Sequence, residues 1–435
     1  MTPLSGFVAG MASPCPEDES DGGRAMPAWG QYVRNYRSAV VGLGCLAALW
    51  AVGWFLQAYG GQAVAARPSE LPPVAAALLT PLSALPLATA AWLLALAGLT
   101  ALVLAAFALA GPVARRYGRR RGPAALVAAA LALLAEPVRA SIGLGHLDVV
   151  VFGLIVADVV ALRRAAWARR RAAWWPGPAA SRPPRGRFDG LRRCWSTGTW
   201  GGAGIGLATA LAGGPAVFIL YLLVIRRWRP AMIAIGTATT LTLGGLLVEP
   251  GGLLQPIDHA GAIGDPANQS LAGLLARLYD STSTPVLVWL SFAALLLAVG
   301  LIRARAAHAD GDEIAAFTLV GLTGAAIAPV TTSHELVWVL PAVLILLDAA
   351  ARVRVGRRPR PRRFTGSGYA AGAFVAYLLV LLPAGWTAGW NAYALAVIVL
   401  MNALPWRPAV VPARLPVRRP AVPARVPAIP GPRGS

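Results

Sequence analysis

The sequence predicts an all-α, polytopic membrane protein. Of the 435 residues, 57% are hydrophobic and 13% are charged, and the apolar residues form blocks about as long as a bilayer crossing instead of amphipathic stripes. The charge balance adds a third observation, because 39 basic residues stand against 18 acidic ones and every basic residue is an arginine. In a soluble protein this excess would suggest nucleic-acid binding. In a membrane protein the positive-inside rule explains it, and that explanation can be tested by position.

The apolar blocks predict about 10–12 crossings, several of them shorter than the roughly 20 residues that a full span needs. The short blocks are expected to be tilted, joined to re-entrant pieces or buried among neighbouring helices. In chain order the expected crossings are 38–57, 88–110, 123–136, 147–162, 199–212, 214–225, 230–248, 284–302, 314–330, 336–350, 368–385 and 392–404.

The arginines test this topology. With both termini cytoplasmic, all of them fall on the inner side except Arg67, Arg139 and Arg277, which leaves 36 of 39 on one face. Such a bias is typical of a multi-pass protein in a bacterial plasma membrane. The strictly arginine-based charge and the abundance of Ala, Gly and Pro also suggest a GC-rich bacterial genome.

Low-complexity segments flank the predicted membrane domain. Residues 1–33 and the Pro/Arg-rich tail 405–435 are expected to be disordered and cytoplasmic, and residues 34–404 form the multi-pass domain. The run that follows RNYR (34–37) is too long for a signal peptide and predicts an uncleaved first helix. The three cysteines, Cys15, Cys45 and Cys194, show no metal-ligand spacing.

The predicted outer segments hold most of the ionisable groups that chemistry would need. Carboxylates act as general bases or hold a metal, and an outer arginine is a natural partner for a phosphate. The groups are Glu70, Glu136, Asp148, Glu249, Asp258, Asp265, Asp280 and Glu335, with His146, His259 and His334 and the three outer arginines.

Structural alternatives exist for several of these residues. Glu136 and Arg139 have the i,i+3 spacing of an ion pair within a helix. In TTSHE (331–335), Thr332 or Ser333 is placed to cap the following helix, with Glu335 at its positive end, and this cap is compatible with a functional site. Gly204 and Gly206 indicate close helix packing and not a nucleotide site.

Five segments, in order, resemble one known family. They are PPVAAALLTPLSALP (72–86), PVRASIGLGHLDVVVFGLIVAD (137–158), GIGLATALAGGPAVFILYLLVIRRWRPA (204–231), NQSLAGLLAR (268–277) and APVTTSHELVWVLP (328–341). The chain resembles the actinobacterial polyprenyl-phosphate-mannose-dependent mannosyltransferases, glycosyltransferase family 87. The resemblance implies a multi-helix GT-C bundle with short re-entrant segments and an extracytoplasmic active site.

The resemblance also implies a reaction. A carboxylate deprotonates an acceptor hydroxyl, which attacks the anomeric carbon of a polyprenyl-phosphate sugar with inversion, so neither nucleotide, cofactor nor resident metal is expected. Cationic groups stabilise the departing phosphate, and Arg277, with Arg139 or Arg67, is assigned to it. His334 falls at a site histidine of the family, while His146, Asn268 and Gln269 stand in motifs expected to bind substrate. The partners would be the lipid-linked donor, a cell-envelope glycolipid or glycan acceptor and membrane lipids.

Departures from the family pattern bear on the base. Residues 58–71 contain no Asp, the family's Gly-Gln-x-Asn has become Gly145-His146-Leu147-Asp148, and Glu335 replaces a second histidine. The candidates for a relocated base are therefore Glu70, then Asp148, then Glu335. Alternatively, the acids at 148 and 335 bind a cation.

A second function class remains open at this point. The same scaffold can serve a non-catalytic lipid-linked-sugar binding protein or a transporter. A transporter needs ionisable residues near mid-membrane, whereas here, Asp158 apart, they gather at the outer ends of helices. This placement favours transfer or binding over transport.

Overall fold

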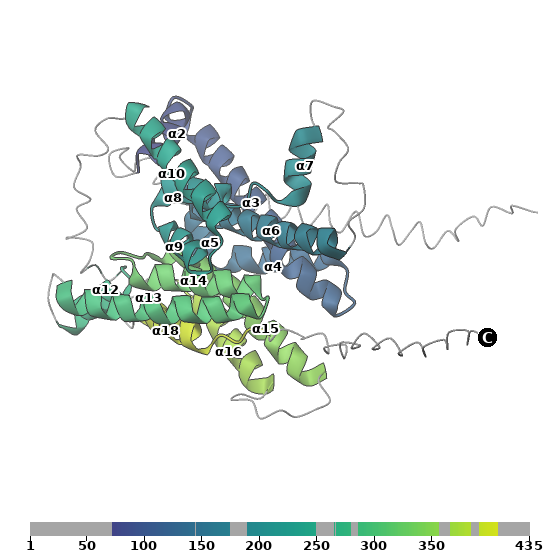
Figure 1. The fold of residues 1–435 in the computed structure, drawn as a ribbon. Helices are drawn as coiled ribbons and strands as arrows, with labels where there is room; N and C mark the ends of the chain where they lie inside the picture. The colour runs from purple at the N-terminus through teal and green to yellow at the C-terminus, as the bar shows by residue number, and fades with distance from the viewer. Residues whose placement is uncertain are drawn as a thin grey trace, which may run out of the picture. The chain divides into compact units, whose positions relative to one another are not determined.

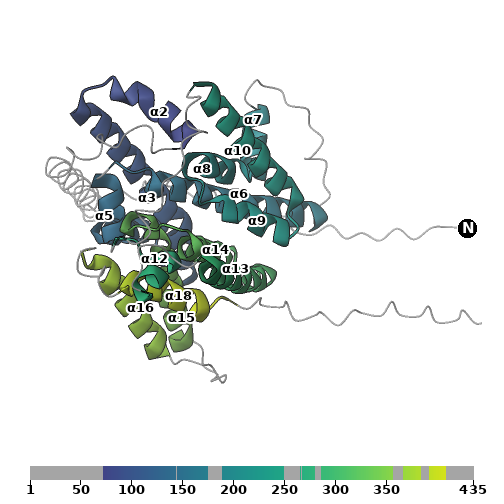
Figure 2. The same ribbon diagram turned by 90° about the vertical axis from the view of Figure 1, so that its left-hand side faces the viewer.

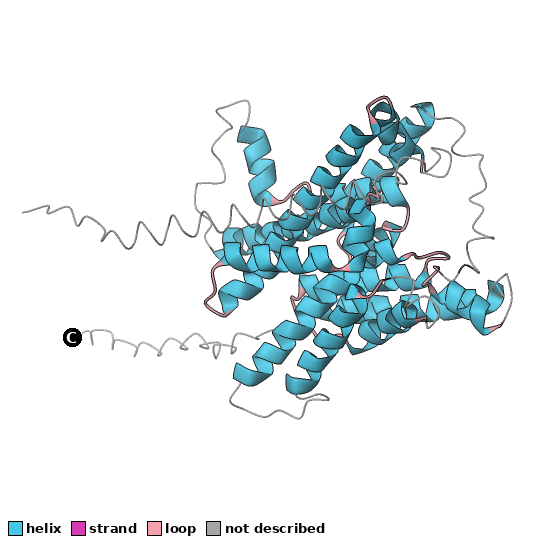
Figure 3. Ribbon diagram, turned by 180° about the vertical axis from the view of Figure 1, so that it is seen from behind, coloured by secondary structure: helices cyan, strands magenta, loops and turns pink. Residues whose placement is uncertain are grey.

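The computed structural model describes residues 72–143, 145–174, 189–248, 265, 267–279, 286–355, 366–383 and 391–407. Within these ranges the chain forms helices joined by loops, with no strand (Figures 1 and 3). Contacts divide the chain at residue 51, and everything described lies in the second unit, 52–435. The helices are α2 (Pro73–Ser83), α3 (Leu87–Arg116), α4 (Arg121–Leu134), α5 (Glu136–Gly143), α6 (Asp148–Trp174), α7 (Asp189–Thr197), α8 (Ala203–Ala212), α9 (Ala216–Val224), α10 (Trp228–Val248), α12 (Leu271–Leu278), α13 (Val286–Ala309), α14 (Glu313–Ile327), the 3-10 helix η4 (Ser333–Trp338), α15 (Val339–Val355), α16 (Gly366–Leu381) and α18 (Ala392–Ala403).

The prediction of an all-α polytopic membrane protein is confirmed. Four helical segments in the described ranges are long and apolar enough to cross a bilayer unaided: Ala88–Arg116, Trp228–Val248, Val286–Ala309 and Ser333–Val353. The bent pair α4 and α5 makes a possible fifth span, and five shorter apolar helices accompany them. Of the shorter helices, α8 and α14 are mostly buried among their neighbours, whereas α16 and α18 are largely not. The figure of about 10–12 crossings stays a prediction.

Predicted crossings and observed helices coincide to within a few residues at most ends. The main deviations are extensions into charged sequence: α3 continues to Arg116, α6 to Trp174 and α13 to Ala309, where ends at 110, 162 and 302 were predicted. Arginine is a good helix former, so a helix that leaves the apolar layer continues until a turn signal stops it. The predicted crossing 38–57 lies outside the described residues.

Four short helices were not predicted, namely α2, α5, α7 and α12. The clearest case is α5, which follows α4 after a single residue, Ala135, and is bent away from it by 75°. Pro137 forces this break, because proline cannot continue the hydrogen-bond ladder of α4 and fits the first turn of a new helix. The bent pair has the form that was expected of a re-entrant segment.

Three groups of helices pack side by side along their lengths. In Figure 1, α13 lies against α14, α15 against α16, and α3 against α4 and α6. Figure 2 shows α8 and α9 gathered with α10, and α8 also contacts α6. The core is built largely from Ala, Val and Leu with a few large rings, as expected where helices approach closely.

A buried carboxylate from another helix accepts a backbone N–H at the start of helix α8. Asp158, in the interior of α6 and fully buried, accepts a hydrogen bond of 2.7 Å from the backbone N–H of Ile205. Gly202 has a positive φ of 107° and faces the carbonyl of Pro230, where a side chain would collide. Gly204 and Gly206 lie against the backbones of α6 and α10, which confirms helix packing as their role.

One indole holds the elements around the predicted His turn. The Trp338 ring meets Phe152 of α6 edge-on at 5.0 Å between ring centroids and Phe218 of α9 at 5.1 Å. Gly321 of α14 lies directly beneath the ring, and any added side chain there would overlap the indole. Trp338 therefore fixes η4 relative to the first turns of α6.

The start of the predicted tail is bonded to the bundle. Trp406 Nε1 donates to Asp310 at 2.8 Å, and the Arg407 guanidinium donates to Asp348 at 2.6 and 2.9 Å. An indole and a guanidinium therefore have defined partners at residues 406 and 407, although the composition is that of a linker. The disordered tail 405–435 stays a prediction.

Candidate functional site

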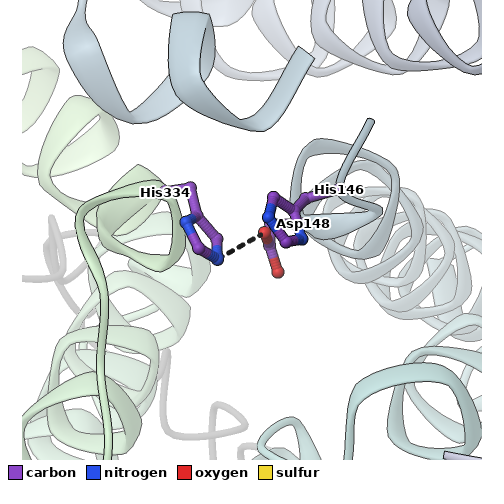
Figure 4. A group of neighbouring side chains, drawn as sticks. All are labelled: His146, Asp148 and His334. Atoms are coloured by element: carbon purple, nitrogen blue, oxygen red, sulfur yellow. Dashed lines mark ion pairs between the residues drawn. The ribbon is translucent and has the colours of Figure 1, made fainter. Parts of the chain in front are cut away.

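The candidate site lies where the α5–α6 loop meets the 3-10 helix η4. Asp148 is the first residue of α6 and His146 precedes it in the loop, while His334 belongs to η4. Gly145 has a positive φ of 70°, which turns the chain between the two helices. Helix α5 packs on η4 directly, so side chains separated by about 190 residues in sequence meet here (Figure 4).

Three of the predicted site residues come together. The rings of His146 and His334 stack with centroids 4.1 Å apart and planes 7° from parallel. His334 Nε2 lies 3.7 Å from Asp148 Oδ2, as the dashed line in Figure 4 shows. Each of the three residues, His146, Asp148 and His334, offers one potential metal-ligand atom, and these three atoms lie within 4.8 Å of one another.

The electrostatics of this group are unusual. Asp148 Oδ2 is shielded from solvent and has no hydrogen-bond partner, which is costly for a carboxylate. Burial, and then the neighbouring His334, lower the pKa of the His146 imidazole, with Asp148 acting in the opposite direction. The His146 ring is therefore neutral at pH 7, which is compatible with stacking on a second imidazole.

The TTSHE segment forms a helix cap, as the structural alternative predicted. Glu335 accepts the backbone N–H of Thr332 through Oε2 at 3.3 Å, the reciprocal half of a capping box. The Thr332 hydroxyl lies 3.1 Å from Nδ1 and 2.9 Å from Nε2 of His334. The cap thus orients the imidazole while occupying the Glu335 carboxylate, and a role for Glu335 as the base stays a prediction.

The Asn-Gln-Ser motif holds the His-bearing turn from behind. Asn268 Nδ2 donates to the carbonyl of Pro329 at 3.0 Å, and its Oδ1 accepts the N–H of Thr331 at 3.0 Å. Gln269 N donates to the carbonyl of Thr331 at 2.7 Å. Both residues are buried. The observed contacts of Asn268 are structural, and substrate binding by Asn268 and Gln269 stays a prediction.

Arg277 is engaged by the protein itself. Its guanidinium donates to the Asn391 side chain at 2.6 Å, to the carbonyl of Asp265 at 3.0 Å and to the carbonyl of Asn268 at 2.8 Å. All three guanidinium nitrogens are thereby used. The assignment of Arg277 to a lipid phosphate stays a prediction, while the observed contacts tie the Asn-Gln-Ser segment to the start of α18.

Arg139 remains more accessible. Its Nη2 pairs with Glu136 at 2.6 Å within α5, which confirms the predicted ion pair, and 39% of its side chain is exposed. Its Nε has no hydrogen-bond partner among the described residues. Arg139 is thus a cation with donor capacity on the helix that packs against η4.

Two predicted site residues, Glu70 and Arg67, lie outside the described residues. Conversely, sequence reasoning missed Thr332 as a partner of His334 and Trp338 as the anchor of η4. The i,i+2 spacing of Thr332 and His334 was visible, but only the fold shows that the hydroxyl turns to the ring. The anchor left no local signal, because Phe152, Phe218 and Gly321 are spread over about 170 residues.

Comparisons with known proteins support this site's context. The chain is 28% identical over 296 residues to a polyprenol-phosphate-mannose-dependent alpha-(1-2)-phosphatidylinositol mannoside mannosyltransferase of Mycobacterium tuberculosis, covering 64% of this chain and 62% of that one. A Mycolicibacterium smegmatis protein of the same description is 30% identical over 251 residues, covering 54% and 49%. A pentamannoside mannosyltransferase of that organism is 26% identical over 303 residues, covering 67% and 64%.

The chain thus spans about half to two thirds of the length of these curated relatives. No solved structure gave a significant match. The sequence model of glycosyltransferase family 87 matches residues 71–329, more than half of the chain and ending just before the TTSHE turn. The order of the motifs, the helical membrane fold and this match lead to one conclusion: the chain belongs to glycosyltransferase family 87.

Proposed function

We propose that this protein transfers a mannosyl residue from a polyprenyl-phosphate donor to a glycolipid of the cell envelope. The names of its relatives specify this donor and phosphatidylinositol mannosides as acceptors. The single observation that carries the proposal is the meeting of Asp148 with His146 and His334, because a carboxylate beside two imidazoles provides a base and hydroxyl-binding groups in one place.

The proposed step is an inverting displacement. The acceptor hydroxyl loses its proton to a carboxylate, its oxygen forms a bond to the anomeric carbon, and the bond from that carbon to the phosphate oxygen breaks. The bonding electrons leave with polyprenyl phosphate. Among the described acids, Asp148 suits the base best, because its Oδ2 is unpartnered while the Glu335 carboxylate accepts a backbone N–H. Glu70 remains a further candidate.

Cations assist the departure of the phosphate. We assign this task first to Arg139, whose guanidinium has spare donors beside η4, since every nitrogen of Arg277 is already bonded within the protein. A preorganised donor stabilises charge that develops on the leaving group. His334 and His146 are then placed to hold sugar hydroxyls.

The deciding experiment is a transfer assay on the full chain in lipid nanodiscs. Polyprenyl-phosphate [14C]mannose is supplied with a panel of phosphatidylinositol mannosides, and extended products are separated and their linkage determined. We expect extension of one acceptor. If the parent protein binds the donor without forming any product, the proposal fails and a non-catalytic binding protein takes its place. Arg139→Gln is expected to lower transfer at least about tenfold, and Arg115→Gln, in the last turn of α3, serves as its control.

Sidedness has its own test. The proposal requires the site to face away from the cytoplasm. The arginine distribution predicts this orientation in a bacterial plasma membrane, with both termini in the cytoplasm. A reporter fused after Gly261 is expected to register outside and one fused after Arg187 inside. The opposite result at either position contradicts the topology.

A further inference from the structure

We propose that His146, Asp148 and His334 bind a divalent first-row transition-metal ion of the zinc class. No other group of three or more His, Cys, Asp and Glu side chains gathers in this way in the part of the chain that the structure describes. The inference concerns ion binding alone and does not rest on the transfer reaction. With an ion bound, Asp148 Oδ2 is a ligand and does not accept the proton of the acceptor hydroxyl, so the role of base then passes to Glu70.

The donor set selects the class of ion. Two imidazole nitrogens and one carboxylate oxygen are typical of zinc sites that keep an open coordination position, and of related sites for iron, cobalt or nickel. Magnesium and calcium prefer oxygen ligands throughout. With three protein ligands, the fourth position is left for water or for an oxygen of a bound molecule, to which the ion would supply Lewis-acid character.

The distances are close to those that coordination requires. Ligand atoms around a tetrahedral zinc ion are about 3.3 Å apart, because each bond is about 2.0–2.1 Å. His334 Nε2 and Asp148 Oδ2 are 3.7 Å apart, and all three ligand atoms lie within 4.8 Å of one another. The stacked rings must turn for their lone pairs to converge. His146 is in an exposed loop position and can rotate between rotamers to do so.

Two further observations point to a ligand at this place. Asp148 Oδ2 is buried from solvent and has no hydrogen-bond partner, although a carboxylate oxygen in such a position normally has one. The Thr332 hydroxyl lies 3.1 Å from Nδ1 and 2.9 Å from Nε2 of His334. With Nε2 on an ion, the hydroxyl would bond Nδ1 alone, as neighbouring polar groups do for metal-binding imidazoles.

The chain contains its own comparison. His308 lies 3.1 Å from Glu313, so it also pairs with an acid, but no third ligand accompanies that pair. The His308–Glu313 pair therefore offers an imidazole and a carboxylate but, among the described residues, no third ligand to complete a metal site. Cys194, a free thiol in a described helix, could also capture the probe ion.

The test is Co²⁺ titration of the purified full chain, with any histidine tag removed, followed by absorption spectroscopy and by competition with Zn²⁺. We expect one ion per chain with the visible bands of a four- or five-coordinate site. His146→Gln and Asp148→Asn, which preserve side-chain size, should each weaken binding at least about tenfold. His308→Ala and Cys194→Ser should bind as the parent protein does.

Thermal unfolding with and without Zn²⁺ separates ligand loss from misfolding. The ion should raise the Tm of the parent and of His308→Ala but not of His146→Gln, while the metal-free Tm values of all three agree. The inference is overturned if the parent shows no saturable uptake, or if His146→Gln and Asp148→Asn bind Co²⁺ as tightly as the parent. Either result would leave the transfer assay unaffected, so the two proposals fail separately.

Discussion

Two carboxylates in the helical bundle, Asp348 and Asp148, differ in how many hydrogen-bond donors surround them. Asp348, near the end of α15, accepts hydrogen bonds from Arg407 at 2.6 and 2.9 Å and from the Tyr117 hydroxyl at 3.1 Å, and it pairs with Arg352 at 3.2 Å. Asp148, at the start of α6, has one oxygen without a hydrogen-bond partner, and this oxygen lies 3.7 Å from Nε2 of the His334 imidazole.

The number of donors around each carboxylate indicates which of the two stabilises the fold. Burying a carboxylate is tolerated when several donors surround it, and Asp348 meets that condition. A carboxylate oxygen without a donor destabilises the fold, and the ion proposed above would supply the missing partner of Asp148. The arginine-rich network around Asp348 ties the residues after α18 to α3 and α15. Asp148 Oδ2 has no hydrogen-bond donor and makes no such connection.

We expect the largest loss of transfer activity from a substitution of Asp148. Asp148→Asn removes the proposed base while keeping the shape of the side chain, so transfer should fall at least about 100-fold and the Tm should remain unchanged or rise. Activity is measured per folded protein in the nanodisc assay. Full activity in this variant would shift the role of base to Glu70 or Glu335, which matched Gln variants then distinguish.

Asp348→Asn should give the reverse pattern. Loss of the charge removes the charge-assisted hydrogen bonds from Arg407 and Tyr117 and is expected to cost about 1.5–3 kcal/mol of stability. Transfer per folded molecule should persist, because the site is at the other end of α15. Thermal unfolding in detergent provides the measurement, and an unchanged Tm would mean that the network is solvated rather than structural.

Arg277→Ala distinguishes two roles that the sequence and the structure favour differently. Its three bonds to Asn391, Asp265 and Asn268 predict a loss of about 1.5 kcal/mol in stability. The family resemblance instead predicts weaker polyprenyl-phosphate binding by a similar free energy. A lowered Tm with unchanged lipid binding supports the structural role, and the opposite pair of results supports phosphate binding.

His334→Ala sharpens the contrast within the site. The imidazole contacts His146, Asp148 and Thr332 but carries no backbone bond of the fold. Its removal should leave the Tm within a degree or two, as is usual for side chains outside the core, and lower transfer about tenfold, or about 1.4 kcal/mol. A large fall in Tm would mean that the stacked pair is part of the scaffold.

The smallest effect belongs to Glu335→Gln. A glutamine can still accept the N–H of Thr332, so only the favourable charge at the helix N-terminus is lost, worth a few tenths of a kcal/mol. Transfer should stay near the parent level. A fall comparable to that of Asp148→Asn would instead identify Glu335 as the base.

Most of the fold followed from the sequence because long apolar blocks have few alternatives in a bilayer. Helix α10 began and ended close to the predicted residues, since a change between apolar and charged sequence marks both of its ends. The candidate site was predicted less completely. His146, Asp148 and His334 were all named, but nothing in one dimension indicated that the two imidazoles would stack.

The remaining misses have a common physical cause. Helix α5 and the bend at Ala135 depend on a proline whose effect is local, but the burial of α5 depends on η4. The contacts of Arg277 depend on Asn391, which is 114 residues away. The sequence pattern led to phosphate binding as the role of Arg277, and the contacts of its guanidinium with Asn391 and two backbone carbonyls could not be predicted from it.

The Asp158 cap at the start of α8 has a consequence for biogenesis. A ten-residue helix with unsatisfied N–H groups at its start is a poor substrate for release into lipid, and here the acceptor for the Ile205 amide is supplied by α6. Segment 203–212 therefore has this acceptor only when α6 is already packed beside it. Translation order supplies the helices in that sequence, so a circular permutant that synthesises α8 before α6 would have to insert the short helix uncapped.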